Sequence, residues 1–255
     1  MLLFRCICLA THTQLYASAL SSILEAHSTV KIVITGATGY IGHEVLDQCL
    51  REPRITSIIA IGRRSPHLNH PKLAVIIQED FSQYPASVIS QIQDANACIY
   101  CLGTNIPVKP AELNRKINFE YATSTAKMFA SIPHTVGSTF RFIYLSGALP
   151  EKNPEKHLWF LADNRKMRGE LENQLLRLHE DHRASGFSIS IARPGFVQPK
   201  GANIRGWLIS IVANAIMLDD IGSAMVHLAI QTHQDVIVEN ESLKTLAKKY
   251  QLDHN

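Results

Sequence analysis

The sequence alternates between short runs of β-branched apolar residues and longer segments whose apolar residues recur at helical spacing. The first run contains Val30, Ile32, Val33 and Ile34, and it suits a strand that is buried on both faces. From residue 40 onward the apolar positions fall at helical intervals, at Ile41, Val45, Leu46, Cys49 and Leu50. This change of period predicts a strand that is followed directly by a helix.

The same alternation continues along the chain. It predicts further strands at residues 57–62, 73–78, 97–103, 140–146 and 187–194, and helices at 111–131 and 157–180. Strands that alternate with helices form a parallel sheet with helices on both faces. We therefore predict an α/β fold, a doubly wound parallel sheet of the Rossmann type with strand order 3-2-1-4-5-6. A length of 255 residues, 46% of them hydrophobic, fits a single domain with small C-terminal elements on the substrate side.

Three glycines stand where the first predicted strand gives way to the first helix. Gly36, Gly39 and Gly42 have the spacing G-x-x-G-x-x-G, which differs from the G-x-G-x-x-G of two-domain dehydrogenases. A pyrophosphate at a helix N-terminus needs exposed backbone N–H groups, no Cβ at the middle glycine and close packing at the last. The pattern predicts a dinucleotide-binding turn, and we expect cofactor contacts at Gly36, Thr38, Gly39, Tyr40, Ile41 and Gly42.

The end of the second predicted strand carries Arg63 and Arg64. In a Rossmann fold the residue at this place meets the adenosine ribose. An acidic residue would accept the 2′-hydroxyl of NAD, whereas guanidinium groups match the 2′-phosphate of NADP. We therefore predict NADP as the cofactor; the alternative is that both arginines are merely solvated. Asp80 and Phe81, after the third strand, are expected to flank the adenine, with a core position as the alternative for Phe81.

The carboxyl ends of parallel strands meet at one edge of the sheet, where ligands of this fold bind. Residues 102–104, 146–148 and 193–195 end or follow three of the predicted strands and would gather at that edge. We expect Leu102, Gly103 and Pro194 to contact the cofactor and Ser146 to stand at the reacting group. The apolar segment 206–212 is expected to supply part of a substrate pocket.

Cysteine spacing raises the question of a metal site. Cys98 and Cys101 form a C-x-x-C, but residues three apart in a strand point to opposite faces and cannot clamp one ion. The total of five cysteines is odd and has no framework spacing, so free thiols in a reducing compartment are expected. We predict no metal site.

An ordered set of short motifs resembles one known family. The set comprises the glycine turn, Gly62-Arg-Arg, Cys101-Leu-Gly-Thr, Leu145-Ser-Gly-Ala, Arg168-Gly-Glu and Arg193-Pro-Gly. Over residues 30–250 it resembles the atypical short-chain dehydrogenase/reductases with an NAD(P)H-binding domain, in particular the Tat-interacting-protein-like oxidoreductases and their fungal and bacterial relatives. The resemblance implies a Rossmann fold, binding of NADPH or NADP⁺ at the glycine turn and the arginines, and a reductase-like or redox-sensing role.

The chain departs from this family at the catalytic residues. Short-chain reductases usually combine a serine with Tyr-x-x-x-Lys, in which the tyrosine gives its proton to a carbonyl as hydride arrives. Ser146 fits the serine, but alignment on Arg168-Gly-Glu places Asn164 at the tyrosine position and Arg168 at the lysine position. We expect Arg168 to hold the nicotinamide ribose. Lys166 is the neighbouring group that could act as a substitute acid or base, with a surface position as the alternative.

The net charge and the N-terminal residues limit which partners and which cellular location we expect. The net charge of +3 is spread along the chain, so no nucleic-acid-binding face is expected. We expect an N-terminal extension over residues 1–29, for targeting or docking, and an NAD(P)-binding domain over 30–255. The early apolar run is shorter than the roughly 20 residues of a membrane span, so no integral membrane segment is predicted. A cytoplasmic location is expected, with mitochondrial or outer-membrane association as the alternative.

Two classes of function agree with these features. The first is an NADP-dependent enzyme, a reductase or an epimerase or isomerase, that acts on an unidentified small molecule with Ser146 polarising a carbonyl. The second is a non-catalytic NADP(H) sensor that controls a protein partner. A homodimer is compatible with either class.

Overall fold

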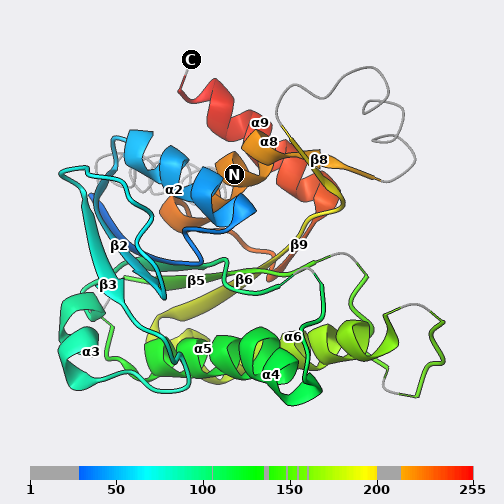
Figure 1. Ribbon diagram of the computed structural model, residues 1–255. Helices are drawn as coiled ribbons and strands as arrows, with labels where there is room; N and C mark the ends of the chain where they lie inside the picture. The colour runs from blue at the N-terminus through cyan, green and yellow to red at the C-terminus, as the bar shows by residue number, and fades with distance from the viewer. Residues whose placement is uncertain are drawn as a thin grey trace, which may run out of the picture.

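The computed structural model describes residues 29–104, 106–134, 138–147, 149–153, 155–159, 161–199 and 214–254. Seven parallel strands form one sheet in the order β3-β2-β1-β4-β5-β6-β9 (Figure 1). Their bounds are β1 Val30–Thr35, β2 Ile55–Gly62, β3 Leu73–Ile77, β4 Ala97–Tyr100, β5 Phe140–Leu145, β6 Phe187–Arg193 and β9 Ile237–Glu239. The predicted order 3-2-1-4-5-6 is confirmed, and β9 extends the sheet beyond β6. The expected N-terminal extension and the segment 206–212 lie outside the described residues.

Helices cover both faces of the sheet (Figure 1). One layer holds α2 Tyr40–Arg51, α8 Leu218–Ile230 and α9 Asn240–Leu252. The other holds α3 Ala86–Ile92, α4 Ala111–Arg115, α5 Tyr121–Ser131 and α6 Ala162–His182. A short 3-10 helix, η2 Arg183–Ser185, follows α6, and β7 Val197–Gln198 pairs in parallel with β8 Ile216–Met217. The predicted single α/β domain of the Rossmann type is confirmed.

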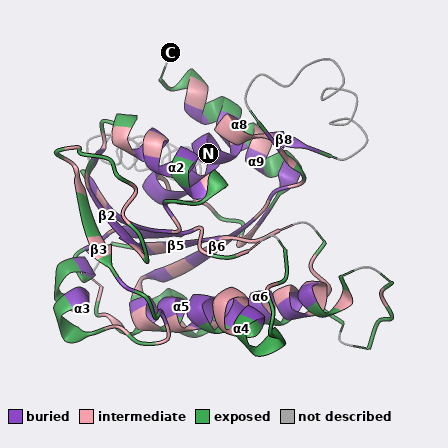
Figure 2. Ribbon diagram, in the orientation of Figure 1, coloured by how far each residue is buried: buried purple, intermediate pink, exposed green. Residues whose placement is uncertain are grey.

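Side-chain alternation along the central strands divides the core into two layers. In β1, Ile32 and Ile34 pack in the layer with α2, α8 and α9, whereas Val33 packs in the layer with α3, α5 and α6. Figure 2 shows that the central strands are largely buried, while β3, at the edge of the sheet, is not. Cys98 faces one layer and Cys101 packs against the other, as the alternation predicts. Among the described residues, no cluster of histidine, cysteine and carboxylate side chains could hold a metal ion.

Two predicted helices differ in their bounds. The helix predicted at 111–131 is continuous but contains a π-helical turn, η1 Lys116–Glu120, between α4 and α5. The helix predicted from residue 157 begins at Ala162, because Leu161 has a left-handed backbone with φ of 46° and interrupts the helical path. A single residue can adopt this left-handed conformation, but a right-handed helix cannot continue through it. Within the described parts of the chain, no helix has the length and apolar character needed to cross a membrane.

A buried carboxylate ties the last helix to the loop after α2. Glu52 accepts hydrogen bonds from the Arg54 guanidinium at 2.8 Å and from the Tyr250 hydroxyl at 2.7 Å. Burial raises the pKa of Glu52, but these hydrogen bonds outweigh burial and bring the pKa down to about 2. The carboxylate therefore stays ionised, and its bond to Tyr250 holds α9 against the loop after α2.

Candidate functional site

The glycine turn has the backbone geometry that its sequence predicts. Gly36 has a φ of 74°, and a Cβ there would lie 2.5 Å from the carbonyl oxygen of Cys101. A Cβ at Gly42 would collide with the carbonyl oxygen of Gly36. Gly39 is the N-cap of α2 and supplies no side-chain cap, so the first N–H groups of the helix remain available to an anion.

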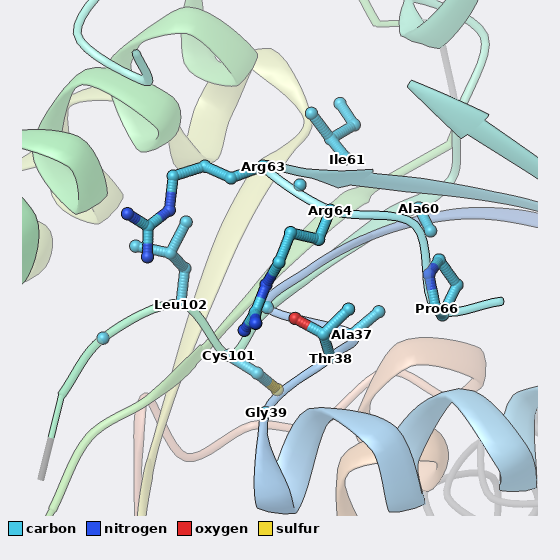
Figure 3. A pocket seen from close by; sticks show the side chains of 13 residues that line it. Ala37, Thr38, Gly39, Ala60, Ile61, Arg63, Arg64, Pro66, Cys101 and Leu102 are labelled. Atoms are coloured by element: carbon cyan, nitrogen blue, oxygen red, sulfur yellow. The ribbon is translucent and has the colours of Figure 1, made fainter. Parts of the chain in front are cut away.

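A pocket of about 150 Å³, here called the turn pocket, lies above this turn (Figure 3). It is formed where β1, β2 and β4 end, which is the carboxyl edge of the sheet. Its lining residues are Gly36, Ala37, Thr38, Gly39, Ala60, Ile61, Gly62, Arg63, Arg64, Pro66, Cys101, Leu102 and Gly103. The pocket therefore brings together three of the predicted turn contacts (Gly36, Thr38 and Gly39), both arginines, Leu102 and Gly103.

The two arginines are available to a ligand. Both side chains are exposed, and neither makes a hydrogen bond or ion pair with another described residue. Figure 3 shows Arg64 directed into the turn pocket on the side of Thr38 and Cys101, whereas Arg63 extends toward Leu102. Among the described residues none holds either guanidinium, which fits a role in binding an anion.

A second pocket, here called the serine pocket, adjoins the turn pocket along the same edge. It measures about 140 Å³ and shares Gly39, Cys101, Leu102 and Gly103 with the turn pocket. Its other lining residues are Tyr40, Ile41, Gly42, Thr104, Asn118, Tyr144, Leu145, Ser146 and Arg168. The predicted Ser146 and Arg168 thus lie in one pocket with the start of α2.

Ser146 is held by a buried ion pair that the sequence does not reveal. Its hydroxyl donates to Glu172 Oε1 at 2.8 Å, and the Glu172 side chain is 0% exposed. Arg193 Nε donates to Glu172 at 3.0 Å, and Arg193 Nη1 pairs with Glu239 at 2.6 Å. Glu172 follows Arg168 by four residues in α6, so both side chains lie on the same helix face. That spacing is the signal by which Glu172 could have been found.

Arg168 and Tyr144 lie close to the same serine. The Arg168 guanidinium packs against Gly147, where a Cβ would collide with Nη1. Tyr144 lies near the end of β5 and precedes Ser146, the residue directly after that strand, by two positions, so both side chains point to the same face of the sheet. Burial raises the pKa of the Tyr144 phenol, Arg168 lowers it, and Glu172 raises it. The serine pocket therefore contains a phenol, which comes from β5 instead of α6.

Asn164, at the family's tyrosine position, is part of a chain of amide hydrogen bonds. Asn114 Nδ2 donates to Asn164 Oδ1 at 2.9 Å, and Asn118 Nδ2 donates to Asn114 Oδ1 at 2.9 Å. The backbone N–H of Thr104 donates to Asn118 Oδ1 at 2.7 Å. This chain connects α6, α4, the π-helical turn and the loop after β4, and it fixes one wall of the serine pocket.

Four predicted site residues lie elsewhere. Lys166 lines a separate hollow with Arg115, Glu151 and Asp163, because two residues along a helix turn the side chain away from the face of Arg168. Phe81 is 0% exposed, and its ring centroid lies 5.6 Å from that of Tyr121, so its side chain has the core position that was the alternative to flanking the adenine. Asp80 is exposed, and Pro194 is buried; neither lines the turn pocket or the serine pocket.

Asp80 has partners within the protein. Its carboxylate accepts a hydrogen bond from the Ser82 backbone N–H at 2.8 Å and pairs with Lys116 at 2.9 Å. These two contacts lower the pKa of Asp80 to about 2. An ionised carboxylate that is already paired with a lysine has a structural explanation without any ligand.

Comparison with known proteins supports the fold more strongly than any one activity. No known protein-family profile matches the chain. Leucinostatins biosynthesis cluster protein T from Purpureocillium lilacinum is 28% identical over 152 residues, which cover 59% of this chain and 52% of that protein. The protein named FMP52, mitochondrial, from Candida albicans is 27% identical over 165 residues, which cover 64% of this chain and 65% of that protein. The chain thus spans less than two thirds of the length of each of these curated relatives.

A solved structure shows the same architecture. The Bordetella bronchiseptica enzyme WbmF, crystallised with NAD⁺ and UDP, superposes with a TM-score of 0.62 at 10% sequence identity. The match covers 89% of this chain and 79% of that one. At this identity the likeness establishes the arrangement of strands and helices.

Proposed function

We propose that this chain binds NADP(H) and acts as an oxidoreductase-like enzyme, a reductase or an epimerase or isomerase, on an unidentified small molecule. The observation that carries the proposal is the continuity of the turn pocket and the serine pocket through Gly39 and residues 101–103. One extended ligand can therefore lie between the free arginines at one end and Ser146 at the other. Two further observations support the proposal. WbmF, whose crystal structure holds NAD⁺ and UDP, has the same fold, and the sequence motifs of this chain resemble those of atypical short-chain dehydrogenase/reductases.

The described residues fit a dinucleotide. Gly36 and Gly42 bring the turn so close to β4 and α2 that no Cβ fits, and the uncapped start of α2 offers N–H groups to a pyrophosphate. Arg63 and Arg64 are free to bind the 2′-phosphate that distinguishes NADP from NAD. When bound, the nicotinamide would accept or supply a hydride beside the serine pocket.

Ser146 and Glu172 would position the substrate oxygen. Because the Ser146 proton already points to Glu172, the lone pairs of Oγ remain available to accept a hydrogen bond from a substrate hydroxyl. To polarise a carbonyl, the hydroxyl must turn from Glu172 toward the substrate. Arg193 holds Glu172 in place during either interaction.

Tyr144 is the group that we assign to proton donation, in place of Lys166. Its phenol lines the same pocket as Ser146 and Arg168, whereas Lys166 lines a different hollow. Burial holds the pKa of the Tyr144 phenol above its ordinary value, and the Arg168 guanidinium offsets part of that effect. The guanidinium favours the ionised phenol, which is the form left after a proton has been given to a substrate oxygen. Arg168 would thereby do part of the work that the family assigns to lysine.

Cofactor binding is tested by titration calorimetry with NADP⁺ and NAD⁺. Gly39→Val places branched carbon where the pyrophosphate approaches and is expected to abolish binding. Gly39→Ala is the matched control, because its Cβ would stand 3.2 Å from the carbonyl oxygen of Gly36 and is a smaller intrusion. Unchanged affinity of a folded Gly39→Val protein would overturn the cofactor assignment.

Turnover is tested with NADPH and a panel of ketones, aldehydes and enones, and with NADP⁺ and the matching alcohols, followed at the nicotinamide absorbance. Ser146→Ala and Tyr144→Phe are expected to lower kcat by about 10²- to 10⁴-fold if they act in proton transfer or polarisation. Lys166→Ala is the control and should leave turnover unchanged. Tight NADP⁺ binding without turnover of any compound would favour the non-catalytic sensor instead.

Location and domain limits are part of the same proposal. We infer a cytoplasmic protein whose cofactor-binding domain starts near residue 30. The alternative is a mitochondrial location, which the name of the Candida albicans relative suggests. Fluorescence imaging distinguishes the two locations when the full chain is compared with a form that lacks residues 1–29. Removal of these residues would change the location only if they act as a targeting extension.

A further inference from the structure

A third pocket shares part of its lining, including Arg64, with the turn pocket. It has a volume of about 220 Å³ and is lined by Thr38, His43, Arg64, Ser65, Pro66 and His67; we call it the histidine pocket. It shares Thr38, Arg64 and Pro66 with the turn pocket. A ligand in the turn pocket can therefore extend one substituent into it.

The polar groups of the histidine pocket match a phosphate monoester. Arg64 supplies a guanidinium, Thr38 and Ser65 supply hydroxyl groups, and His43 and His67 supply imidazoles. None of the described residues that line it is acidic. Every one of these side chains can donate a hydrogen bond to a phosphate oxygen, and the imidazoles carry a positive charge when protonated.

Local backbone structure determines the positions of His43 and His67. His43 lies in the first turns of α2, where its N–H donates to the carbonyl oxygen of Gly39 at 2.8 Å. His67 has a left-handed backbone with φ of 53°, and its N–H donates to Ser65 Oγ at 3.2 Å. That bond uses a lone pair of the Ser65 oxygen and leaves the hydroxyl proton for a ligand.

We propose that the histidine pocket holds the 2′-phosphate of NADP(H) between Arg64 and the two imidazoles, so that His43 and His67 make the preference for NADP over NAD increase as pH falls. This inference rests on the proposed cofactor, and it adds a pH dependence to that site. The imidazole charge changes between about pH 5 and 8, whereas the guanidinium charge does not.

The charged groups near the histidine pocket keep the same charge over the pH range of the experiment. Arg63 and Glu79 line an open hollow with Arg64. On α2, Asp47 lies one turn beyond His43 and pairs with Arg51 at 2.7 Å. Carboxylates and guanidinium groups keep their charge between pH 6.5 and 8, whereas imidazoles as a class can change theirs. Among the described residues that line the histidine pocket, His43 and His67 are the two imidazoles.

The loop also contains a matched control. His70 Nδ1 accepts a hydrogen bond from the Lys72 N–H, and His70 does not line the pocket. A His70→Gln protein loses one imidazole from the same loop without changing the proposed subsite. His43 and His67 are exposed, so their replacement by glutamine should leave the fold intact.

The experiment measures dissociation constants of NADP⁺ and NAD⁺ by titration calorimetry at pH 8 and pH 6.5. The proteins are the wild type, His70→Gln, and the double variant His43→Gln/His67→Gln. The 2′-phosphate itself takes up a proton near pH 6, and this affects all three proteins equally. An exposed charge contact is worth roughly 1.4- to 5-fold in affinity. We therefore expect lowering the pH to raise NADP preference about 2- to 5-fold more in wild type and His70→Gln than in the double variant.

The outcomes separate this inference from the cofactor proposal. An NADP preference with the same pH dependence in all three proteins would overturn the role of the histidines and leave the cofactor assignment standing. Equal binding of NADP⁺ and NAD⁺ at both pH values would overturn the 2′-phosphate subsite. Failure of the folded wild type to bind either dinucleotide would refute the proposed function as well.

Discussion

Replacing Glu172 with alanine measures how strongly the buried ion pair behind Ser146 stabilises the protein. The change leaves Arg193, whose side chain is 15% exposed, without its buried partner. Removing one member of a buried ion pair costs about 3–5 kcal/mol, because the remaining charge is uncompensated. Arg193 still contacts Glu239, so we expect the lower end, about 3 kcal/mol. Ser146 also loses its acceptor, which adds about 0.5–1.5 kcal/mol.

Urea denaturation followed by circular dichroism gives the free energy of unfolding for each variant. Glu239→Ala is the matched control, since it removes the second carboxylate that pairs with Arg193. The Glu239 side chain is 61% exposed. We expect that control to cost less than about 1 kcal/mol. A third protein, Glu172→Ala/Arg193→Met, removes both charges and should recover part of the loss. Equal destabilisation by Glu172→Ala and Glu239→Ala would refute the reasoning, because it would mean that burial does not strengthen this pair.

Three further outcomes are expected. Arg63→Ala/Arg64→Ala should lower the preference for NADP⁺ over NAD⁺ by about 10- to 10⁴-fold in titration calorimetry, since charged hydrogen bonds contribute roughly 1.5–3 kcal/mol each; an unchanged preference would make both arginines bystanders. Phe81→Ala should destabilise the protein by about 3–5 kcal/mol in urea denaturation, because the ring is fully buried, and should leave NADP⁺ affinity unchanged. The pKa of Glu52, about 2 in the folded state, lies below its ordinary value, so the stability that its ionised form contributes is present above about pH 4.5 and lost as pH falls toward 2. The difference in unfolding free energy between wild type and Glu52→Gln should therefore shrink over that range, and a difference independent of pH would contradict it.

Most of the sheet could be predicted because its strands follow a simple period. Buried parallel strands are continuous apolar runs, and the amphipathic α2 and α5 stand between them. Helix α8 was missed because residues 221–230 are buried on every side, which removes the polar face that reveals a helix. Strand β9 has three residues, too few for a period to be read.

The candidate site divides in the same way. The glycine turn could be predicted because its chemistry is local: backbone conformation and close approach are encoded by the glycines themselves. The spacing of four residues from Arg168 points to Glu172, but the partners of Glu172 could not be predicted, because Ser146 and Arg193 come from two other elements that only the folded sheet brings together. Asp80 and Phe81 are adjacent in the chain but face solvent and core respectively, and a loop has no period that decides between these directions.

The π-helical turn at Lys116–Glu120 gives this site a sensitivity to chain length. A π turn contains one more residue than the α-helical turn it replaces. Deleting one residue there would restore the regular i→i−4 register and rotate α4 by about 100° relative to α5. Asn114 would then turn away from Asn164, and the loop carrying Thr104 would lose its anchor to α6. The extra residue thus acts as a spacer, so insertions and deletions in this helix should be tolerated far less than substitutions on its exposed face.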